Sequence, residues 1–469
     1  MNVLFVITNI NGTYSDAYSF GLASIASITR DKGFDYEYAV INTYKDYNNF
    51  FDLVGQIKPK IIAYTSVSSQ FKFIIELSQK IDFFFQGSII QVCGGIHPTI
   101  FPECLFEAPS LDGIFVGEGE YAFSDFLDKM QSNQNFKDVN NFCYIQNGKL
   151  VKNPLYLLEP NIDKFPFPER EKYGYERFIK KNGYATFIFT RGCPYSCSFC
   201  SNHAIAKAYQ ITNNKPRSRS PHRCIDEIKE IRKRYKVEKI YVGDDTFGLN
   251  KQWAEQFCTL YAREIALPLI VQLRVNMVNE ELMTLLKLAG CIHVTCGVES
   301  GNSYIRNEIL NRHISDDQII KAFILFKKYG MTTTAINIIG TPHETIDNIW
   351  DTIKLNRKIN PTNSGINIFY PYRGTKLGDY CFEKKLVDVK FISDFSKERR
   401  ESILDYPEDF KRLLEHFYDN WDWLIYKYRP YRFFYKQMTK FTKNKFPRLW
   451  NFLRYFKGEL KKLFSKANG

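Results

Sequence analysis

The chain has 469 residues, of which 44% are hydrophobic and 16% aromatic. This length suits two or three domains, and this composition excludes an intrinsically disordered chain. The formal net charge is +13, but the segment 427–469 holds thirteen Lys or Arg residues and one acidic residue, Glu459. The basic character therefore belongs to the carboxyl-terminal segment and indicates nothing about the partners of the rest of the chain.

The first residues are Met-Asn-Val-Leu-Phe-Val-Ile-Thr, and no basic stretch precedes the apolar run. This start predicts a first β-strand and not a signal peptide. No stretch reaches the ~18 uninterrupted apolar residues of a spanning helix. We therefore expect a cytoplasmic protein, in which a tight group among the eleven cysteines indicates metal binding or catalysis before disulfides.

Short apolar runs and amphipathic runs alternate over residues 1–150. Strands are predicted at 3–8, 36–41, 61–66, 89–93 and 113–116, and helices at 19–32, 71–84 and 121–130. Strands separated by helical patterns predict βαβ units and a parallel sheet, here a flavodoxin-like, Rossmann-type α/β domain. The ligand of such a domain binds beyond the carboxyl ends of the strands.

Small and polar residues follow three of these predicted strands. They are Ser66 and Ser68 after the third strand, Gly94, Gly95 and His97 after the fourth, and Gly117 and Glu118 after the fifth. Glycine at such a place lets a flat or elongated ligand approach the backbone. The phosphate-binding pattern Gly-x-Gly-x-x-Gly does not follow the first strand, which disfavours a dinucleotide-binding domain.

Residues 151–180 contain four prolines, at 154, 160, 166 and 168, and this density predicts an extended linker. A second alternation fills residues 181–385. Its predicted strands are 185–190, 239–243, 269–273, 293–297, 333–339 and 366–369, with helices at 224–235, 251–265, 280–288, 316–329 and 344–356. Six β/α units predict a partial (β/α)6 TIM barrel. Residues 386–469 are predicted to form a helical, basic and aromatic region.

Three cysteines, Cys193, Cys197 and Cys200, follow the first strand of this barrel with the spacing Cys-x3-Cys-x2-Cys. A compact loop of this kind can wrap three thiolates around an iron–sulfur cubane and leave its fourth iron open for a substrate, as an open catalytic zinc site does. There are two alternative interpretations. The cysteines can belong to a structural zinc site that His203 completes, or they can be inert buried thiols.

This motif resembles the signature of the radical S-adenosylmethionine (SAM) superfamily. The resemblance implies that the three cysteines hold a 4Fe–4S cluster and that the amino and carboxylate groups of SAM chelate the open iron. One electron from the cluster then cleaves SAM and yields a 5′-deoxyadenosyl radical. It also implies an oxygen-sensitive enzyme that receives electrons from a donor such as flavodoxin or ferredoxin.

The same resemblance assigns SAM contacts to residues near the ends of the barrel strands. It places Phe199 and Ile338 against adenine, Asp244 and Asp245 at the ammonium group, Arg274 at the carboxylate, and Glu299, Ser300 and Gly340 around the amino acid, ribose and adenine. A carboxylate after a strand can instead cap a helix or lie on the surface. The order in which these residues occur along the chain supports the assignment.

Residues 1–150 resemble the cobalamin-binding domain that precedes many radical SAM barrels, and the resemblance to this pair of domains in their usual order covers residues 1 to about 385. It implies cobalamin near the residues that follow the strands of the first domain. The family's cobalt-ligating pattern, Asp-x-His-x-x-Gly, would follow the first strand, but here residues 9–16 contain no histidine. The radical SAM branch commonly lacks it. His97 can approach the corrin or satisfy a loop carbonyl.

The resemblance implies methyl transfer from cobalamin to an unactivated carbon of a small-molecule or lipid-like substrate. The same pair of domains also supports cyclisation, ring rearrangement and oxidation, and a methylthiotransferase or a non-catalytic binding protein on this fold are further alternatives. The aromatic, basic tail suits an anionic membrane surface at the inner face of the membrane or a helical cap on the barrel. Stacking on single-stranded nucleic acid is the weakest of its three interpretations.

Overall fold

The computed structural model describes residues 2–10, 18–211, 215–387 and 398–428. The predicted basic tail, apart from its first two residues, lies outside these ranges. None of the helices described is both long enough and apolar enough to cross a membrane. All eleven cysteines lie in the described part, and none forms a disulfide.

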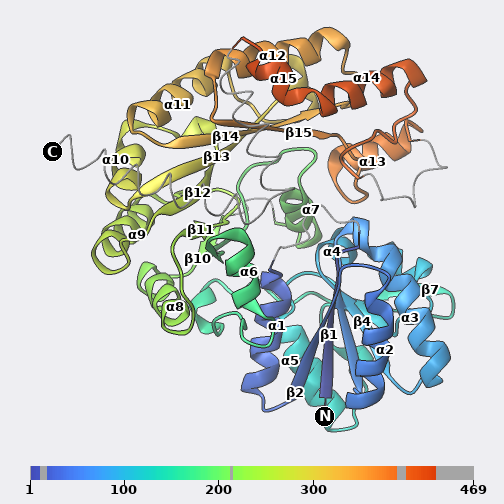
Figure 1. The fold of residues 1–469 in the computed structure, drawn as a ribbon. Coiled ribbons are helices and arrows are strands. Elements are labelled where there is room, and N and C mark those ends of the chain that lie inside the picture. Colours follow the sequence, from blue (N-terminus) through green and yellow to red (C-terminus); the bar gives the residue numbers. More distant parts are fainter. Residues whose placement is uncertain (1, 11–17, 212–214, 388–397, 429–469) are drawn as a thin grey trace.

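A seven-stranded sheet with the order β2-β1-β3-β4-β5-β6-β7 forms the first domain (Figure 1). Its parallel strands are β1 (Asn2–Thr8), β2 (Asp35–Ile41), β3 (Ile61–Thr65), β4 (Ile90–Gly94) and β5 (Gly113–Phe115). The order 2-1-3-4-5 confirms the flavodoxin-like prediction. The apolar run of β1 is buried on both faces, as a central parallel strand requires.

Helices cover both faces of this sheet. They are α1 (Phe20–Asp31), α2 (Asp46–Ile57), α3 (Phe71–Phe85), α4 (Ile96–Ile100) and α5 (Glu120–Gln131). Leu22 of α1 and Phe126 of α5 pack into one hydrophobic core, whereas Phe50 of α2 and Leu77 of α3 pack into another. The antiparallel hairpin of β6 (Phe142–Gln146) and β7 (Lys149–Lys152) extends the sheet beyond β5 and was not predicted, nor was α2.

Six parallel strands form the second domain in the consecutive order β8-β11-β12-β13-β14-β15, which confirms the partial (β/α)6 barrel. They are β8 (Ala185–Phe187), β11 (Ile240–Val242), β12 (Leu269–Leu273), β13 (Cys291–Glu299), β14 (Thr332–Ile339) and β15 (Asn363–Ile368). The connecting helices are α8 (Pro221–Arg234), α9 (Lys251–Glu264), α10 (Glu280–Leu288), α11 (Asp316–Lys328) and α12 (Ile346–Ile359).

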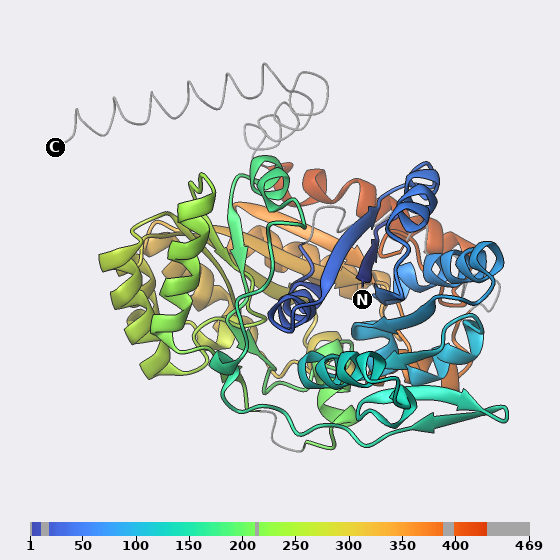
Figure 2. The same ribbon diagram turned by 90° about the horizontal axis from the view of Figure 1, so that it is seen from below.

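The barrel is an open crescent with its helices on the outside, and the first domain faces its open side (Figures 1 and 2). Helix α7 (Ser201–Ala208) lies between the two and contacts α4 of the first domain. After β15 the chain forms α13 (Lys376–Glu383), α14 (Glu408–Asp419) and α15 (Trp421–Tyr426). Leu414 of α14 and Trp421 of α15 pack against Ile353 of α12 in a small hydrophobic core.

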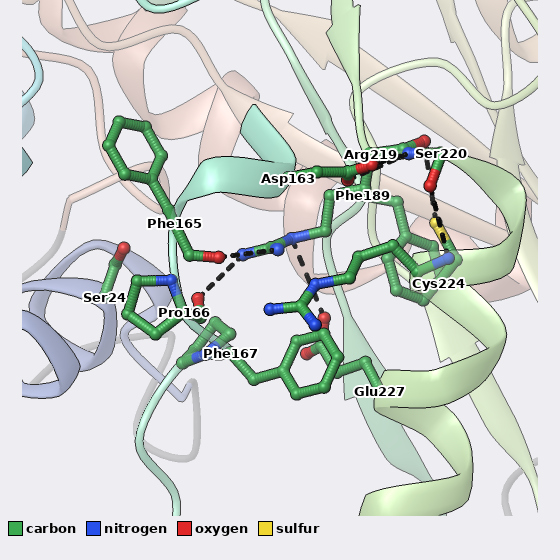
Figure 3. Close-up of polar contacts among 12 residues, drawn as sticks. Ser24, Asp163, Phe165, Pro166, Phe167, Phe189, Arg219, Ser220, Cys224 and Glu227 are labelled. Carbon is green, nitrogen blue, oxygen red and sulfur yellow. Dashed lines mark hydrogen bonds and ion pairs between the residues drawn. The ribbon is translucent and has the colours of Figure 1, made fainter. Parts of the chain in front are cut away.

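The proline-rich segment between β7 and α6 (Tyr175–Asn182) packs along the barrel (Figure 3). The buried Arg219 guanidinium donates hydrogen bonds to the carbonyls of Phe165 (3.1 Å) and Pro166 (2.9 Å), and the Ser220 N–H donates to Asp163 (3.0 Å). These contacts give the segment a fixed path from one domain to the other. The boundaries at 150, 180 and 385 stay predictions, although β7 and α6 show that regular structure extends into both ends of 151–180.

Candidate active site

A cavity of about 370 Å³ lies where the carboxyl ends of the two parallel sheets face each other. The first domain contributes Thr65, Gly94, Gly95, Gly117 and Glu118, and the second contributes Thr190, Gly192, Asn202, Tyr209 and Asp245, among others. Ligands of flavodoxin-like sheets and of barrels bind at these strand ends. Here both ligand-binding edges border one space.

The cysteine loop, residues 193–200, connects β9 (Thr190–Arg191) to α7. Gly192 has φ +87°, a conformation that glycine adopts without strain, and this lets the chain turn directly before Cys193. The Ser198 N–H donates to the Leu310 carbonyl (3.2 Å), and its hydroxyl donates to the Ile309 carbonyl (2.6 Å). These bonds hold the loop over the ends of the barrel strands.

Two arginines surround the thiol of Cys197. Arg274 Nη1 donates to Cys197 Sγ at 3.2 Å, and Arg312 Nη1 lies 4.0 Å from the same sulfur. The Nε groups of both arginines are buried with no hydrogen-bond partner among the described residues. Burial raises the pKa of Cys193, and it raises the pKa of Cys200 to about 12, so their thiolates need nearby positive charge.

This donor set fits a three-cysteine cluster. Each thiolate of such a cluster binds a different iron atom, and the two buried guanidiniums can balance the negative charge that the ligated cluster carries. Among the described residues, no three His, Cys, Asp or Glu side chains converge where a single metal ion would bind.

Three of the predicted SAM contacts lie in suitable places. Asp245 lines the cavity, where the surrounding protein limits its solvation and raises its pKa. Phe199 and Ile338 pack in the same apolar cluster, as two residues against one flat ring would. The contacts of all three with SAM stay predictions.

The other predicted SAM contacts already have partners within the protein. Asp244 Oδ1 accepts hydrogen bonds from the N–H groups of Phe189 (2.7 Å) and Thr190 (3.1 Å), so Asp244 supports the chain just before the cysteine loop. Burial raises its pKa to about 7, and its Oδ2 has no hydrogen-bond partner among the described residues. Arg274 is occupied by Cys197, as described above.

The end of β13 shows the same pattern. Glu299 pairs with Arg312 at 3.1 Å, and burial raises the pKa of Glu299 despite this cation. The Ser300 hydroxyl is buried against Thr352 of α12 (3.3 Å). A Cβ on Gly340 would lie 2.9 Å from Leu414 of α14. Ser300 and Gly340 therefore face the packed outer layer, and their contact with SAM stays a prediction.

The predicted cobalamin residues divide into two groups. Gly94, Gly95, Gly117 and Glu118 line the cavity, whereas Ser66, Ser68 and His97 do not. A Cβ on Gly95, whose φ is +102°, would lie 2.7 Å from the Ser66 carbonyl oxygen, so this wall requires glycine. A backbone surface without side chains at the strand ends fits the flat corrin of cobalamin.

His97 is a buried histidine that is not among the residues lining the cavity. Its Nδ1 lies 3.0 Å from the Ser68 hydroxyl, and its ring packs against Phe71. Its partner is therefore a side-chain hydroxyl and not the loop carbonyl considered above. Among the described residues, no histidine lines the cavity.

Protonation of His97 should destabilise the fold. Burial lowers its pKa from 6.5 to about 4, so the unfolded chain takes up the proton first as the pH falls. Stability therefore falls between pH 6.5 and pH 4, by on the order of 2 kcal/mol from pH 7 to pH 5. Chemical denaturation should show that His97→Gln, which stays neutral, lacks this part of the pH dependence. An unchanged pH dependence in the variant would contradict the assignment.

Several site residues were missed in the sequence. Arg191 precedes the cysteine loop, Tyr209 follows α7, Glu120 follows Gly119, and Arg312 lies in the segment after β13. Two of them lie next to predicted features: Arg191 precedes the cysteine motif, and Glu120 comes two residues after Glu118. The others come to the site through tertiary packing, which no local pattern predicts.

Comparisons with known proteins agree with this geometry. Residues 187–355 match the model of the radical SAM superfamily, and residues 8–127 match that of the B12 binding domain. An uncharacterized methyltransferase of Pyrococcus horikoshii is 29% identical over 374 residues, which cover 78% of this chain and 79% of the relative. An anaerobic magnesium-protoporphyrin IX monomethyl ester cyclase of Rubrivivax gelatinosus is 28% identical and covers 77% of this chain, but the match spans 66% of the cyclase.

The fold is similar to that of a solved structure. The radical SAM methyltransferase TsrM from Kitasatospora setae, with tryptophan and a SAM analogue bound, superposes with a TM-score of 0.68 at 15% identity. The match covers 81% of this chain and 76% of TsrM. This similarity shows a common fold over both domains.

Proposed function

Because the chain belongs to the radical SAM superfamily, in the branch with an amino-terminal B12 binding domain, we propose that it transfers a methyl group to an unactivated carbon of a small molecule. The observation that carries the proposal is the shared cavity. The glycine-lined strand ends of the first domain and the start of the cysteine loop border the same space. Cofactors held on these two walls would face a common substrate.

When bound, the cluster and SAM supply a 5′-deoxyadenosyl radical that takes hydrogen from the substrate, and cobalamin supplies the methyl group. Cys193, Cys197 and Cys200 would hold the cluster, and Asp245 would accept a hydrogen bond from the SAM ammonium group. The apolar side chains Ile188, Ile205 and Ile96 line the cavity and would exclude water from the radical. Gly94 and Gly95 would let the corrin lie on the backbone.

The products of SAM test this proposal without knowledge of the substrate. Anaerobic protein with a reconstituted cluster, hydroxocobalamin, a low-potential reductant and SAM should form both 5′-deoxyadenosine and S-adenosylhomocysteine. The first product arises from radical generation and the second from loss of the SAM methyl group. Omitting cobalamin should lower S-adenosylhomocysteine more than about tenfold, because cobalamin is the proposed carrier of the methyl group; a tenfold loss of rate corresponds to about 1.4 kcal/mol of barrier. Formation of 5′-deoxyadenosine alone, with or without cobalamin, would contradict methyl transfer.

The 28% identity to a cyclase keeps cyclisation as a second candidate. A cyclase would form 5′-deoxyadenosine, and a deuterated SAM methyl group would not enter its product. Methylthio transfer, by contrast, would need a further group of cysteines in the first domain. The cysteines there, Cys93, Cys104 and Cys143, are buried in a hydrophobic core, which raises their pKa.

Three further expectations concern partners and location. A flavodoxin or ferredoxin as electron donor would meet the need to reduce the cluster, and a cytoplasmic location is proposed from the sequence alone. Contact of the basic tail with an anionic membrane, and with it a lipid-like substrate, depends on residues beyond 428. It is proposed from their sequence alone.

A further inference from the structure

One short turn of the first domain contacts the chain on both sides of the cysteine loop, at Arg191 before it and at Tyr209 after α7. Residues 117–120, Gly-Glu-Gly-Glu, form this turn, which follows β5 and ends at the first residue of α5, and all four line the cavity. Within its own domain the turn is fixed, because the Gly117 N–H donates to Thr99 Oγ1 (3.0 Å) and Asn141 Nδ2 donates to the Glu118 carbonyl (3.2 Å). We call it the coupling turn.

Two arginines tie the front of the cysteine loop to the coupling turn. Arg191, two residues before Cys193, pairs with Glu120 (2.5 Å) and with Glu118 (3.2 Å). Arg217 belongs to β10 (Arg217–Ser218), lies opposite Arg191 in the short antiparallel pair of β9 and β10, and also pairs with Glu118. Two adjacent cations would repel each other, and the two carboxylates of the turn balance them.

The pair of Glu120 and Arg191 is well enclosed. The Glu120 side chain is 5% exposed, and its carboxylate also accepts a hydrogen bond from the Ser24 hydroxyl (2.7 Å). Burial opposes the ionisation of Glu120, but Arg191 and these hydrogen bonds outweigh it, so the pKa of Glu120 lies below its ordinary value. A charge-assisted pair in such surroundings is strong and directional, unlike an exposed pair.

Tyr209 ties the back of the loop to the same turn. Helix α7 begins directly after Cys200, and Tyr209 caps its other end. The phenol oxygen accepts a hydrogen bond from the Glu118 N–H (2.6 Å), and a Cβ on Gly117 would lie 2.1 Å from that oxygen. Gly117 is thus the residue that lets Tyr209 approach the turn.

From these contacts we infer that the coupling turn is a positioning element, which sets the place of the cluster-binding loop relative to the cobalamin wall. Glu120 acts through Arg191, and Tyr209 acts through the Glu118 backbone. Without these contacts each domain keeps its own cofactor, but the spacing between the two cofactors is no longer fixed. The inference rests on the pair of cofactors and not on methyl transfer.

Electron paramagnetic resonance of the full chain tests this inference, since both cob(II)alamin and the reduced cluster carry an unpaired spin. The wild type should show one resolved spin–spin interaction between them. In Glu120→Gln, which keeps the side-chain shape but loses the charge, the resolved interaction should be lost while iron and cobalamin contents stay at wild-type levels. The control is Glu103→Gln, which breaks an exposed pair with Lys152 (2.8 Å) outside the cavity and should keep the interaction.

An unchanged interaction in Glu120→Gln would overturn the inference. Loss of cobalamin with retention of the cluster would also overturn it, because the turn would then be a binding wall alone. If Glu120→Gln does not fold, Tyr209→Phe decides in its place, since it removes a single hydroxyl. A lost interaction in this variant supports the positioning role, and a wild-type interaction overturns it. These spectra need no substrate, so their outcome is independent of the reaction that the enzyme catalyses.

Discussion

Replacement of Cys193, Cys197 and Cys200 together by alanine should remove all bound iron and all cleavage of SAM. Structural 4Fe–4S clusters have one cysteine for each iron, whereas this loop supplies three thiolates for a cluster whose fourth iron must stay open. The anaerobically reconstituted wild type should bind about four irons per chain and form 5′-deoxyadenosine, and the variant should do neither.

A matched triple variant separates this effect from a general loss of cysteines. Cys258, Cys291 and Cys296 lie in the hydrophobic core of the same barrel, away from the cavity. Their replacement by alanine should lower stability through lost packing, by about 1 kcal/mol per site, but keep the iron and the SAM cleavage. Iron content and 5′-deoxyadenosine formation at wild-type levels in the first variant would disprove the assignment of the cluster.

The sequence predicted the parts of the fold that follow from local pattern. Buried parallel strands such as β1 and β12 are short apolar runs, and helices such as α10 keep an amphipathic period, so their positions were predicted to within about two residues. The hairpin β6–β7 was missed because apolar and polar residues alternate only weakly along its two strands, and because β7 has a lysine at each end. Its stability comes from pairing with β5, which is a tertiary contact.

The residues of the candidate site also divide into those that a local sequence pattern predicts and those that only tertiary contacts bring together. The cysteine motif is local, and its spacing alone indicated a cluster. The glycines at 94, 95 and 117 were found because glycine after a strand has a local meaning. Ser300 and Gly340 were also chosen by their position after a strand, but they face α12 and α14, which the strand pattern does not place. Arg312 reaches Cys197 from a segment far along the chain, so its role needed the structure.

Gly94→Leu should weaken cobalamin binding without unfolding the first domain. Gly94 ends β4 and lines the cavity, its φ is not in the left-handed region, and an added Cβ would meet Phe115 at an ordinary 3.8 Å. A leucine there should extend into the space that the corrin needs. Overpacking of this kind costs about 1–3 kcal/mol, which corresponds to roughly 5–150-fold weaker binding.

Absorbance titration with hydroxocobalamin measures this loss, and Gly55→Leu is the control. Gly55 lies on the exposed face of α2 with no atom within 4 Å of an added Cβ, and leucine is a better helix former than glycine. The wild type and the control should retain cobalamin after desalting, with the spectrum of a base-off form, because no histidine lines the described part of the cavity. Unchanged affinity in Gly94→Leu, with the variant folded, would show that cobalamin does not lie over the end of β4.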